Sequence, residues 1–255
     1  IISGATSSQD IYVYDNNQEG EQLGWKKVKA PELDITGHSV SQYKNFLYIY
    51  GGNQFKDDVY ELNTDDYSIK TYSDFSEDQK PEARMNHSSV VYNDKFYIYG
   101  GTNEIGQPLS DLWAFDLNTK KWEKKGQFCV PRTGHQGILL GNEYVIVGGK
   151  PKGDTISINL DTLEKKVVND FGNYPAGLNG FSIAVGNDNT AIIYGGVEST
   201  SKAPKNTVYT AKLNDSWSQK VVEEEKKNPE LTNEKNQQDE MKPIITTFRA
   251  VNLDG

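Results

Sequence analysis

One pattern, an apolar run that ends in a pair of glycines, occurs four times along the chain at nearly constant spacing. The runs are residues 46–50, 96–99, 144–147 and 191–194, and the second glycines that follow them are residues 52, 101, 149 and 196. The spacings are therefore 49, 48 and 47 residues, and a weaker copy at residues 1–4 lies another 48 residues upstream. A period of this length indicates a repeat architecture in which each unit is one supersecondary motif.

Other features keep the same phase. His38, His87 and His135 each lie 14 residues before their second glycine. A further strand is predicted after each glycine pair, beginning at residues 10, 58, 111, 155 and 207, and Trp25, Trp122 and Trp217 mark a fourth strand. Turn residues separate these runs. Each unit is therefore predicted to be four short strands in an antiparallel meander.

This pattern resembles the kelch repeat, and residues 100–122 are the best match. The resemblance covers almost the whole chain and implies an all-β, kelch-type β-propeller of four-stranded antiparallel blades, with residues 1–255 as a single domain. The physics agrees, because one four-stranded sheet buries both its faces only when it packs radially between two neighbours. Burial on both faces also explains why the runs are apolar without strict alternation.

The two ends of the chain are predicted to share one blade. Residues 246–254 resemble a first strand, so we expect them to pair beside residues 1–4 and to close a composite blade. Four complete blades and this one give five. The alternative is a parent protein with a sixth or seventh blade. The very polar stretch 223–243 is predicted to be an insertion, either a solvated loop or a short frayed helix.

Charge and composition exclude several classes of function. The net charge is −9 and no Lys/Arg cluster stands out, which argues against nucleic-acid and membrane partners. No apolar run approaches the roughly 20 residues that span a bilayer, and no signal peptide is visible, so a cytoplasmic location is expected. The single cysteine, Cys129, rules out an intramolecular disulfide and a metal site of several thiolates.

The residues that could bind a metal or take part in catalysis are better explained as structural residues of the repeat. The three histidines occupy equivalent positions in successive repeats, so we predict no metal site and no cofactor. Among kelch-like propellers, the copper site of galactose oxidase needs a Cys–Tyr crosslink, and the iron site of plant specifier proteins needs an acidic spacing that is absent here. No phosphate loop or nucleophile elbow is present. We therefore predict that the chain is not an enzyme.

The resemblance implies that peptides bind on one face of the ring. This face is formed by the loops that join strand four to the next strand one and by the loops that follow the glycine pairs. The expected partner-binding residues are Arg84, Asn86, Arg132, Thr133, Tyr174, Asn179, Arg249, Gln54, Phe55, Asn103, Glu104, Lys150 and Glu198.

Two kinds of residue in this set have a competing interpretation. Arg84 and Arg132 either bind an acidic peptide or satisfy carbonyls and acidic neighbours between blades. Phe55 either folds back on its blade or anchors an interface. We expect a protein–protein interaction module within a larger intracellular protein. The alternatives are a small enzyme that acts on a sugar at the pore mouth, such as a mutarotase, and a purely structural propeller.

Overall fold

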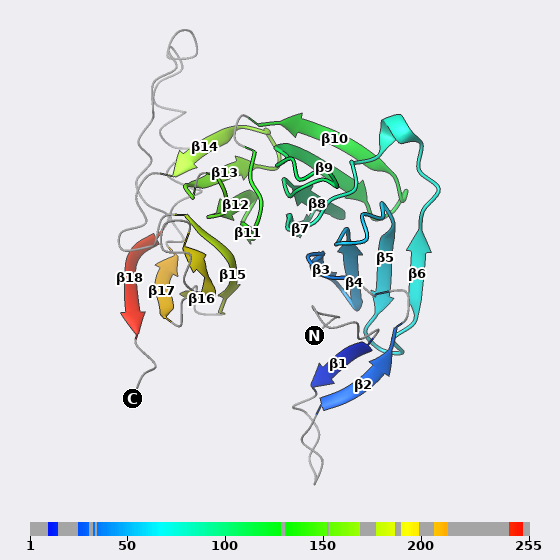
Figure 1. The fold of residues 1–255 in the computed structure, drawn as a ribbon, viewed down its shortest axis with the longest axis horizontal. Coiled ribbons are helices and arrows are strands. Elements are labelled where there is room, and N and C mark those ends of the chain that lie inside the picture. The colour runs from blue at the N-terminus through cyan, green and yellow to red at the C-terminus, as the bar shows by residue number, and fades with distance from the viewer. Residues whose placement is uncertain are drawn as a thin grey trace.

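A computed structural model describes residues 10–14, 25–30, 33, 35–128, 131–151, 153–168, 177–186, 190–198, 207–213 and 245–251. Their regular structure is almost entirely β, apart from the short 3-10 helix η2 (Glu77–Gln79). Five sheets follow one another along an arc (Figure 1). Across the described ranges, no helix has the length and apolar character to cross a bilayer.

Four of the sheets are four-stranded antiparallel meanders, which we number blade 1 to blade 4. Blade 1 holds β3 (Ser39–Tyr43), β4 (Phe46–Tyr50), β5 (Val59–Asn63) and β6 (Ile69–Tyr72), and blade 2 holds β7 (Ser88–Tyr92), β8 (Lys95–Tyr99), β9 (Asp111–Asp116) and β10 (Trp122–Gln127). Blade 3 holds β11 (Gln136–Leu140), β12 (Glu143–Val147), β13 (Thr155–Asn159) and β14 (Lys165–Val168), and blade 4 holds β15 (Leu178–Val185), β16 (Thr190–Glu198), β17 (Val208–Leu213) and β18 (Ile245–Val251). The first strand of each blade lies nearest the centre (Figure 1). The predicted kelch-type propeller architecture is confirmed.

The fifth sheet, which we call the N-terminal sheet, consists of β1 (Asp10–Tyr14) and β2 (Trp25–Lys29). These are the third and fourth strands of a repeat, as the positions of Asp10 and Trp25 predict. Its second strand was predicted at residues 1–4, which lie outside the described residues.

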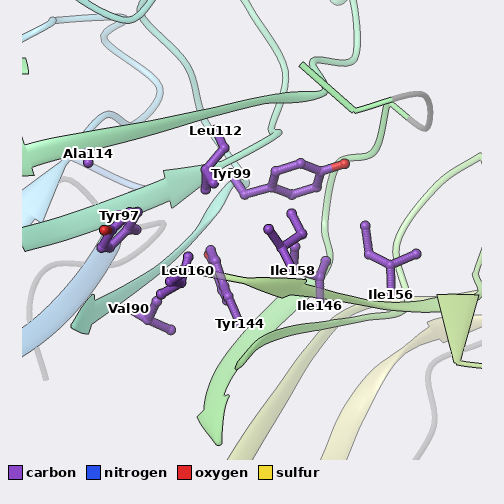
Figure 2. Packing of buried hydrophobic residues seen from close by; sticks show 10 residues of the cluster. All are labelled: Val90, Tyr97, Tyr99, Leu112, Ala114, Tyr144, Ile146, Ile156, Ile158 and Leu160. Atoms are coloured by element: carbon purple, nitrogen blue, oxygen red, sulfur yellow. The ribbon is translucent and has the colours of Figure 1, made fainter. Parts of the chain in front are cut away.

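The core is divided among the interfaces between blades. Tyr48 and Tyr50 of blade 1 pack against Phe96 and Ile98 of blade 2. In the next interface, Tyr97 and Tyr99 of blade 2 face Tyr144 and Ile146 of blade 3 (Figure 2). Successive residues of the second strand thus face opposite neighbours, since side chains alternate between the two faces of a sheet. This explains the continuous apolar runs in the sequence.

The prediction for the C-terminal strand is wrong. Residues 245–251 form β18, which pairs with β17 from Val208↔Val251 to Leu213↔Ile245 and so completes blade 4 as its outermost strand. They are thus the fourth strand of a blade and not the first, and their expected partner, residues 1–4, lies outside the described residues. The composition of this segment indicates a strand, but any unpaired sheet edge can accept a strand, and here the edge of β17 does. Trp217 and the polar stretch 223–243 lie outside the described residues.

Candidate functional site

A belt of backbone hydrogen bonds joins the four blades at or just before their first strands, which lie nearest the centre of the arc (Figure 1). Asn86 N–H donates to the Gly37 carbonyl at 2.7 Å, Gly134 N–H to Asn86 at 2.9 Å, and Gly180 N–H to Gly134 at 2.8 Å. All four residues are left-handed, with φ between 56° and 75°. Glycine and asparagine adopt this conformation most readily. We call these four residues the backbone belt.

The two sets of loops meet beside this belt. Asn53 N–H donates to the Thr36 carbonyl at 2.8 Å. The equivalent residues of the next blades, Thr102 with Met85 and Lys150 with Thr133, exchange two hydrogen bonds each. The residue after each glycine pair therefore lies against the residue before each belt position. We call residues 35–38, 51–58, 73–87, 100–110, 131–135 and 148–151 the loop face.

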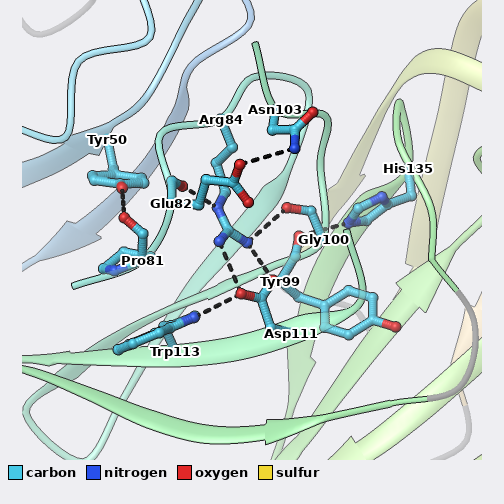
Figure 3. Close-up of polar contacts among 10 residues, drawn as sticks. All are labelled: Tyr50, Pro81, Glu82, Arg84, Tyr99, Gly100, Asn103, Asp111, Trp113 and His135. Carbon is cyan, nitrogen blue, oxygen red and sulfur yellow. Dashed lines mark hydrogen bonds and ion pairs between the residues drawn. The ribbon is translucent and has the colours of Figure 1, made fainter. Parts of the chain in front are cut away.

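Arg84 is buried in this face and held by structural contacts (Figure 3). Its guanidinium donates to both carboxylate oxygens of Asp111, at 2.6 and 3.0 Å, and to the Gly100 carbonyl at 3.0 Å. Burial alone would raise the pKa of the Asp111 carboxyl, but the hydrogen bonds and charge of Arg84 outweigh it and hold that pKa below its usual value.

Arg132 repeats the arrangement in blade 3. It donates to the Asp154 carboxylate at 2.7 Å and to the Gly148 carbonyl at 3.0 Å. Both arginines are 0% exposed. The geometry thus supports the structural interpretation of Arg84 and Arg132. Because both guanidiniums are already bound within their blades, they are not available to bind an acidic ligand.

The histidines belong to the packing between blades. Nε2 of His87 lies 2.7 Å from the Ser39 hydroxyl of the preceding blade, and Nε2–H of His135 donates to the Tyr99 carbonyl at 3.1 Å. Burial lowers the pKa of His135 to about 3 and that of His87 well below its usual value. Over the described ranges, no three His, Cys, Asp or Glu side chains gather where a metal could bind.

The other predicted site residues differ in accessibility. Gln54, Glu104 and Lys150 are exposed, while Phe55, Asn86, Thr133, Asn179 and Glu198 are partly buried. Tyr174 lies outside the described residues, and for Arg249 only the backbone, in β18, is described. Most of the described residues that were predicted to bind a partner therefore lie in the loop face, but some of them are not exposed at its surface.

Asn103 is 4% exposed and organises the loop between β8 and β9. Its Oδ1 accepts from Gln107 N–H at 2.8 Å, and its Nδ2 donates to Glu82 Oε1 at 2.9 Å. Gly106 N–H donates to the Asn103 carbonyl at 3.0 Å and closes a turn. Asn103 thus fixes the loop and leaves the tip of the turn to meet solvent.

Sequence reasoning missed the residue at that tip. Ile105 is 84% exposed, the largest value among the exposed large hydrophobic side chains of the described residues. A signal was present in the sequence, since Ile105 stands between Glu104 and Gly106 in a polar loop, where an isoleucine contributes nothing to a core.

Comparisons with known proteins agree with this architecture. The family profile of the KLHDC2/KLHL20/DRC7 Kelch-repeats domain matches residues 2–196. The chain is 33% identical over 155 residues to Host cell factor 2 of Homo sapiens, a match that covers 49% of this chain and 19% of that protein. It is 26% identical over 197 residues to Acyl-CoA-binding domain-containing protein 4 of Arabidopsis thaliana, covering 72% and 29%.

A third relative, Kelch domain-containing protein 3 of Rattus norvegicus, is 29% identical over 126 residues, covering 44% of this chain and 33% of that protein. The chain thus spans between 19% and 33% of these three relatives. A solved structure titled "Structure of YjhT" shares the fold, with a TM-score of 0.59 at 14% identity over 70% of this chain and 61% of that one. Since the family profile matches well over half of its residues, the chain belongs to the KLHDC2/KLHL20/DRC7 Kelch-repeats domain family.

Proposed function

We propose that this chain is the protein-recognition module of a larger intracellular protein and that it holds a protein or peptide partner on the loop face. One observation carries the proposal: the backbone belt fixes the loops of successive blades in the same way, while the exposed side chains differ from blade to blade. Asn53 and Gln54 come from blade 1, Glu104 and Ile105 from blade 2, and Lys150 from blade 3.

Such an arrangement is suited to recognition. Loops that are already ordered lose little conformational freedom when a partner binds, so more of the interaction energy appears as affinity. Different side chains on an equivalent backbone supply specificity, as binding loops on a rigid scaffold do.

Ile105 has the properties of an interface anchor. The Asn103–Glu82 hydrogen bond and the turn at residues 103–106 hold its backbone in place while its side chain meets water. A fixed apolar side chain has a low entropic cost of burial, and anchors of binding energy are usually few and central. We therefore place Ile105 in the contact surface.

The state of the ionisable groups supports binding over catalysis. The arginines and histidines that acid–base or electrophilic chemistry would use are buried in contacts between or within blades, as described for Arg84, Arg132, His87 and His135. Exposed carboxylates of Asp74, Glu77, Asp78 and Glu104 favour a protein partner over a polyanion such as nucleic acid.

A photo-crosslinking experiment tests the proposal. p-Benzoylphenylalanine is placed at position 105, and in a matched variant at Lys70, an exposed residue within β6 that does not belong to the loop face. Irradiation in a cell lysate is expected to give a discrete adduct from position 105 and none from position 70. Excess chain without the crosslinker should compete for the partner and reduce the amount of this adduct. Excess chain that carries Ile105→Asp should not reduce it. Equal adducts from both positions, or none from position 105, would place the partner elsewhere.

A further inference from the structure

The exposed charges on the loops of blade 2 are all negative. Residues 73–87 and 100–110 carry five exposed carboxylates, those of Asp74, Glu77, Asp78, Glu82 and Glu104. The lysine and the arginine of the same two segments are already paired. Lys80 lies between the carboxylates of Asp57 and Glu77, and Arg84 is buried against Asp111. The surface that these loops present to a partner is therefore negative.

Two of these carboxylates belong to the turn that carries Ile105 or are bound to it. Glu104 precedes Ile105 in the turn at residues 103–106. Glu82 accepts a hydrogen bond at 2.9 Å from Asn103 of the same turn (Figure 3). Asn103 is uncharged, and no described residue forms an ion pair with Glu82 or Glu104. A ligand that buries Ile105 thus meets carboxylates that still lack a counter-ion.

The exposed cations of the loop face lie on the neighbouring blades. Lys56 belongs to the loop after the glycine pair of blade 1, and Lys150 to the corresponding loop of blade 3. Arg132 of blade 3 is 0% exposed and is held by Asp154. The negative part of the loop face is therefore centred on blade 2, which is also the blade that presents Ile105.

We infer that the partner held on the loop face presents a basic segment, in which an apolar side chain contacts Ile105 and a lysine or arginine beside it pairs with Glu82 and Glu104. This inference rests on the proposed function and adds the charge of the partner to it. Arginine suits such a site best, because its planar guanidinium pairs well with carboxylates. An acidic segment would bring like charges together, which is unfavourable and excludes wrong partners.

The overall charge of the chain acts in the same direction as the local charge. The net charge of −9 attracts a basic segment from a distance and raises the rate of association. Salt screens this attraction beyond about 8 Å at physiological ionic strength. Added salt should therefore lower the affinity for the partner, mainly through a slower association rate. A contact made by Ile105 alone would not weaken in this way.

Competition in the photo-crosslinking experiment tests the charge of the partner. The chain with p-benzoylphenylalanine at position 105 reports binding, and variants without the crosslinker compete with it. Glu104→Lys and Glu164→Lys change the net charge equally, but Glu164 is an exposed residue between β13 and β14 that does not belong to the loop face. Halving the adduct should take about tenfold more of the Glu104→Lys chain than of the unmodified chain. The Glu164→Lys chain should compete as the unmodified chain does.

Two further measurements complete the test. Both glutamates are exposed, so thermal unfolding should be the same in the two variants and in the unmodified chain. Mass spectrometry of the adduct identifies the segment of the partner that is crosslinked to position 105. This segment should contain more Lys and Arg than Asp and Glu, and the amount of adduct should fall as salt is added.

The outcomes separate this inference from the proposed function. If no adduct forms at position 105, the proposed function is wrong and the inference falls with it. If the adduct forms but the two lysine variants compete equally, the partner is bound without recognition of its charge. In that case, or if the crosslinked segment is acidic, the inference alone is overturned and the proposed function stands.

Discussion

The guanidinium of Arg84 and the carboxylate of Asp111 form two parallel hydrogen bonds, at 2.6 and 3.0 Å, with side chains that are 0% and 14% exposed. Trp113 Nε1–H donates to the same carboxylate at 2.8 Å. This pair ties the loop before β7 to the start of β9, and so holds the loop face on blade 2. Paired charges at this depth are costly to separate, because the remaining partner is left uncompensated.

We therefore expect Arg84→Ala to lower the free energy of unfolding by about 3–5 kcal/mol, measured by urea denaturation. Arg132→Ala is the matched comparison. The side chain of its partner Asp154 is 33% exposed, and its carboxylate accepts one guanidinium hydrogen bond where that of Asp111 accepts two, so water can replace part of what is lost. The cost of Arg132→Ala should be smaller. Equal losses in the free energy of unfolding would mean that the exposure of the paired aspartate does not determine how much stability is lost.

Stability should fall as the pH is lowered below neutrality because burial, nearly complete for His135 and partial for His38, keeps these histidines neutral in the folded chain. Burial lowers the pKa of His135 to about 3 and that of His38 to about 4. The unfolded chain has ordinary histidines and takes up protons first, near pH 6.5. Each buried histidine should therefore reduce the free energy of unfolding by about 1.4 kcal/mol per pH unit between pH 6.5 and its folded pKa.

His135→Gln separates this effect from other titrations. Gln can donate to the Tyr99 carbonyl that His135 now contacts, but it does not titrate. Urea denaturation at pH 7 and pH 5 should show a shallower loss of stability in the variant than in the unmodified chain. An identical pH dependence would show that another group is responsible.

Gly101 is predicted to be intolerant of a side chain for two separate reasons. Its φ is +97°, and an added Cβ would lie 2.8 Å from both the His87 Cβ and the Met85 carbonyl oxygen. Gly106 has a φ of +82° but no atom within 4 Å of an added Cβ. We expect Gly106→Ala to cost about 1–2 kcal/mol from backbone strain, and Gly101→Ala to cost about 1–3 kcal/mol more from steric overlap. Thermal unfolding of the two variants measures the difference, and equal losses would contradict the steric argument.

Lys120 should contribute to the cohesion of blades 1 and 2. From the β9–β10 turn its ammonium reaches Glu61 Oε2 of blade 1 at 2.6 Å and lies about 5 Å from the ring centroids of Tyr48 and Tyr72. Burial of Lys120 would lower its pKa, but the hydrogen bonds to Glu61 and Tyr48 raise it overall. A double-mutant cycle of Lys120→Met and Glu61→Gln should give a coupling energy of about 0.5–3 kcal/mol. A coupling of zero in urea denaturation would show that the two side chains act independently.

Local pattern was sufficient to predict the repeat and most of its strands. Residues 46–50, 96–99 and 144–147 were predicted as apolar strands before glycine pairs and are strands in the structure. The histidines were predicted as equivalent positions of the repeat, and the contacts of His87 and His135 between blades explain that recurrence. Such features follow from spacing along the chain, which the sequence contains directly.

Pairing over long distances was not predictable in the same way. The strand character of residues 245–251 could be inferred from composition, but not that they pair with β17 rather than beside residues 1–4. Strand propensity does not specify an edge, because backbone hydrogen bonds are the same at every edge. The exposure of Ile105 was likewise missed, since it depends on a turn fixed by the Asn103–Glu82 contact.

The sequence by itself determined the repeat, its four-stranded unit and the residues that recur in it, because each depends on local spacing and on side-chain alternation. The tertiary structure alone decided which equivalent residues are buried and which meet solvent. Tyr97 and Ile192 hold the same repeat position, yet one is 3% and the other 43% exposed. The difference is whether another blade packs on that face, and burial is a property of the neighbour as much as of the residue.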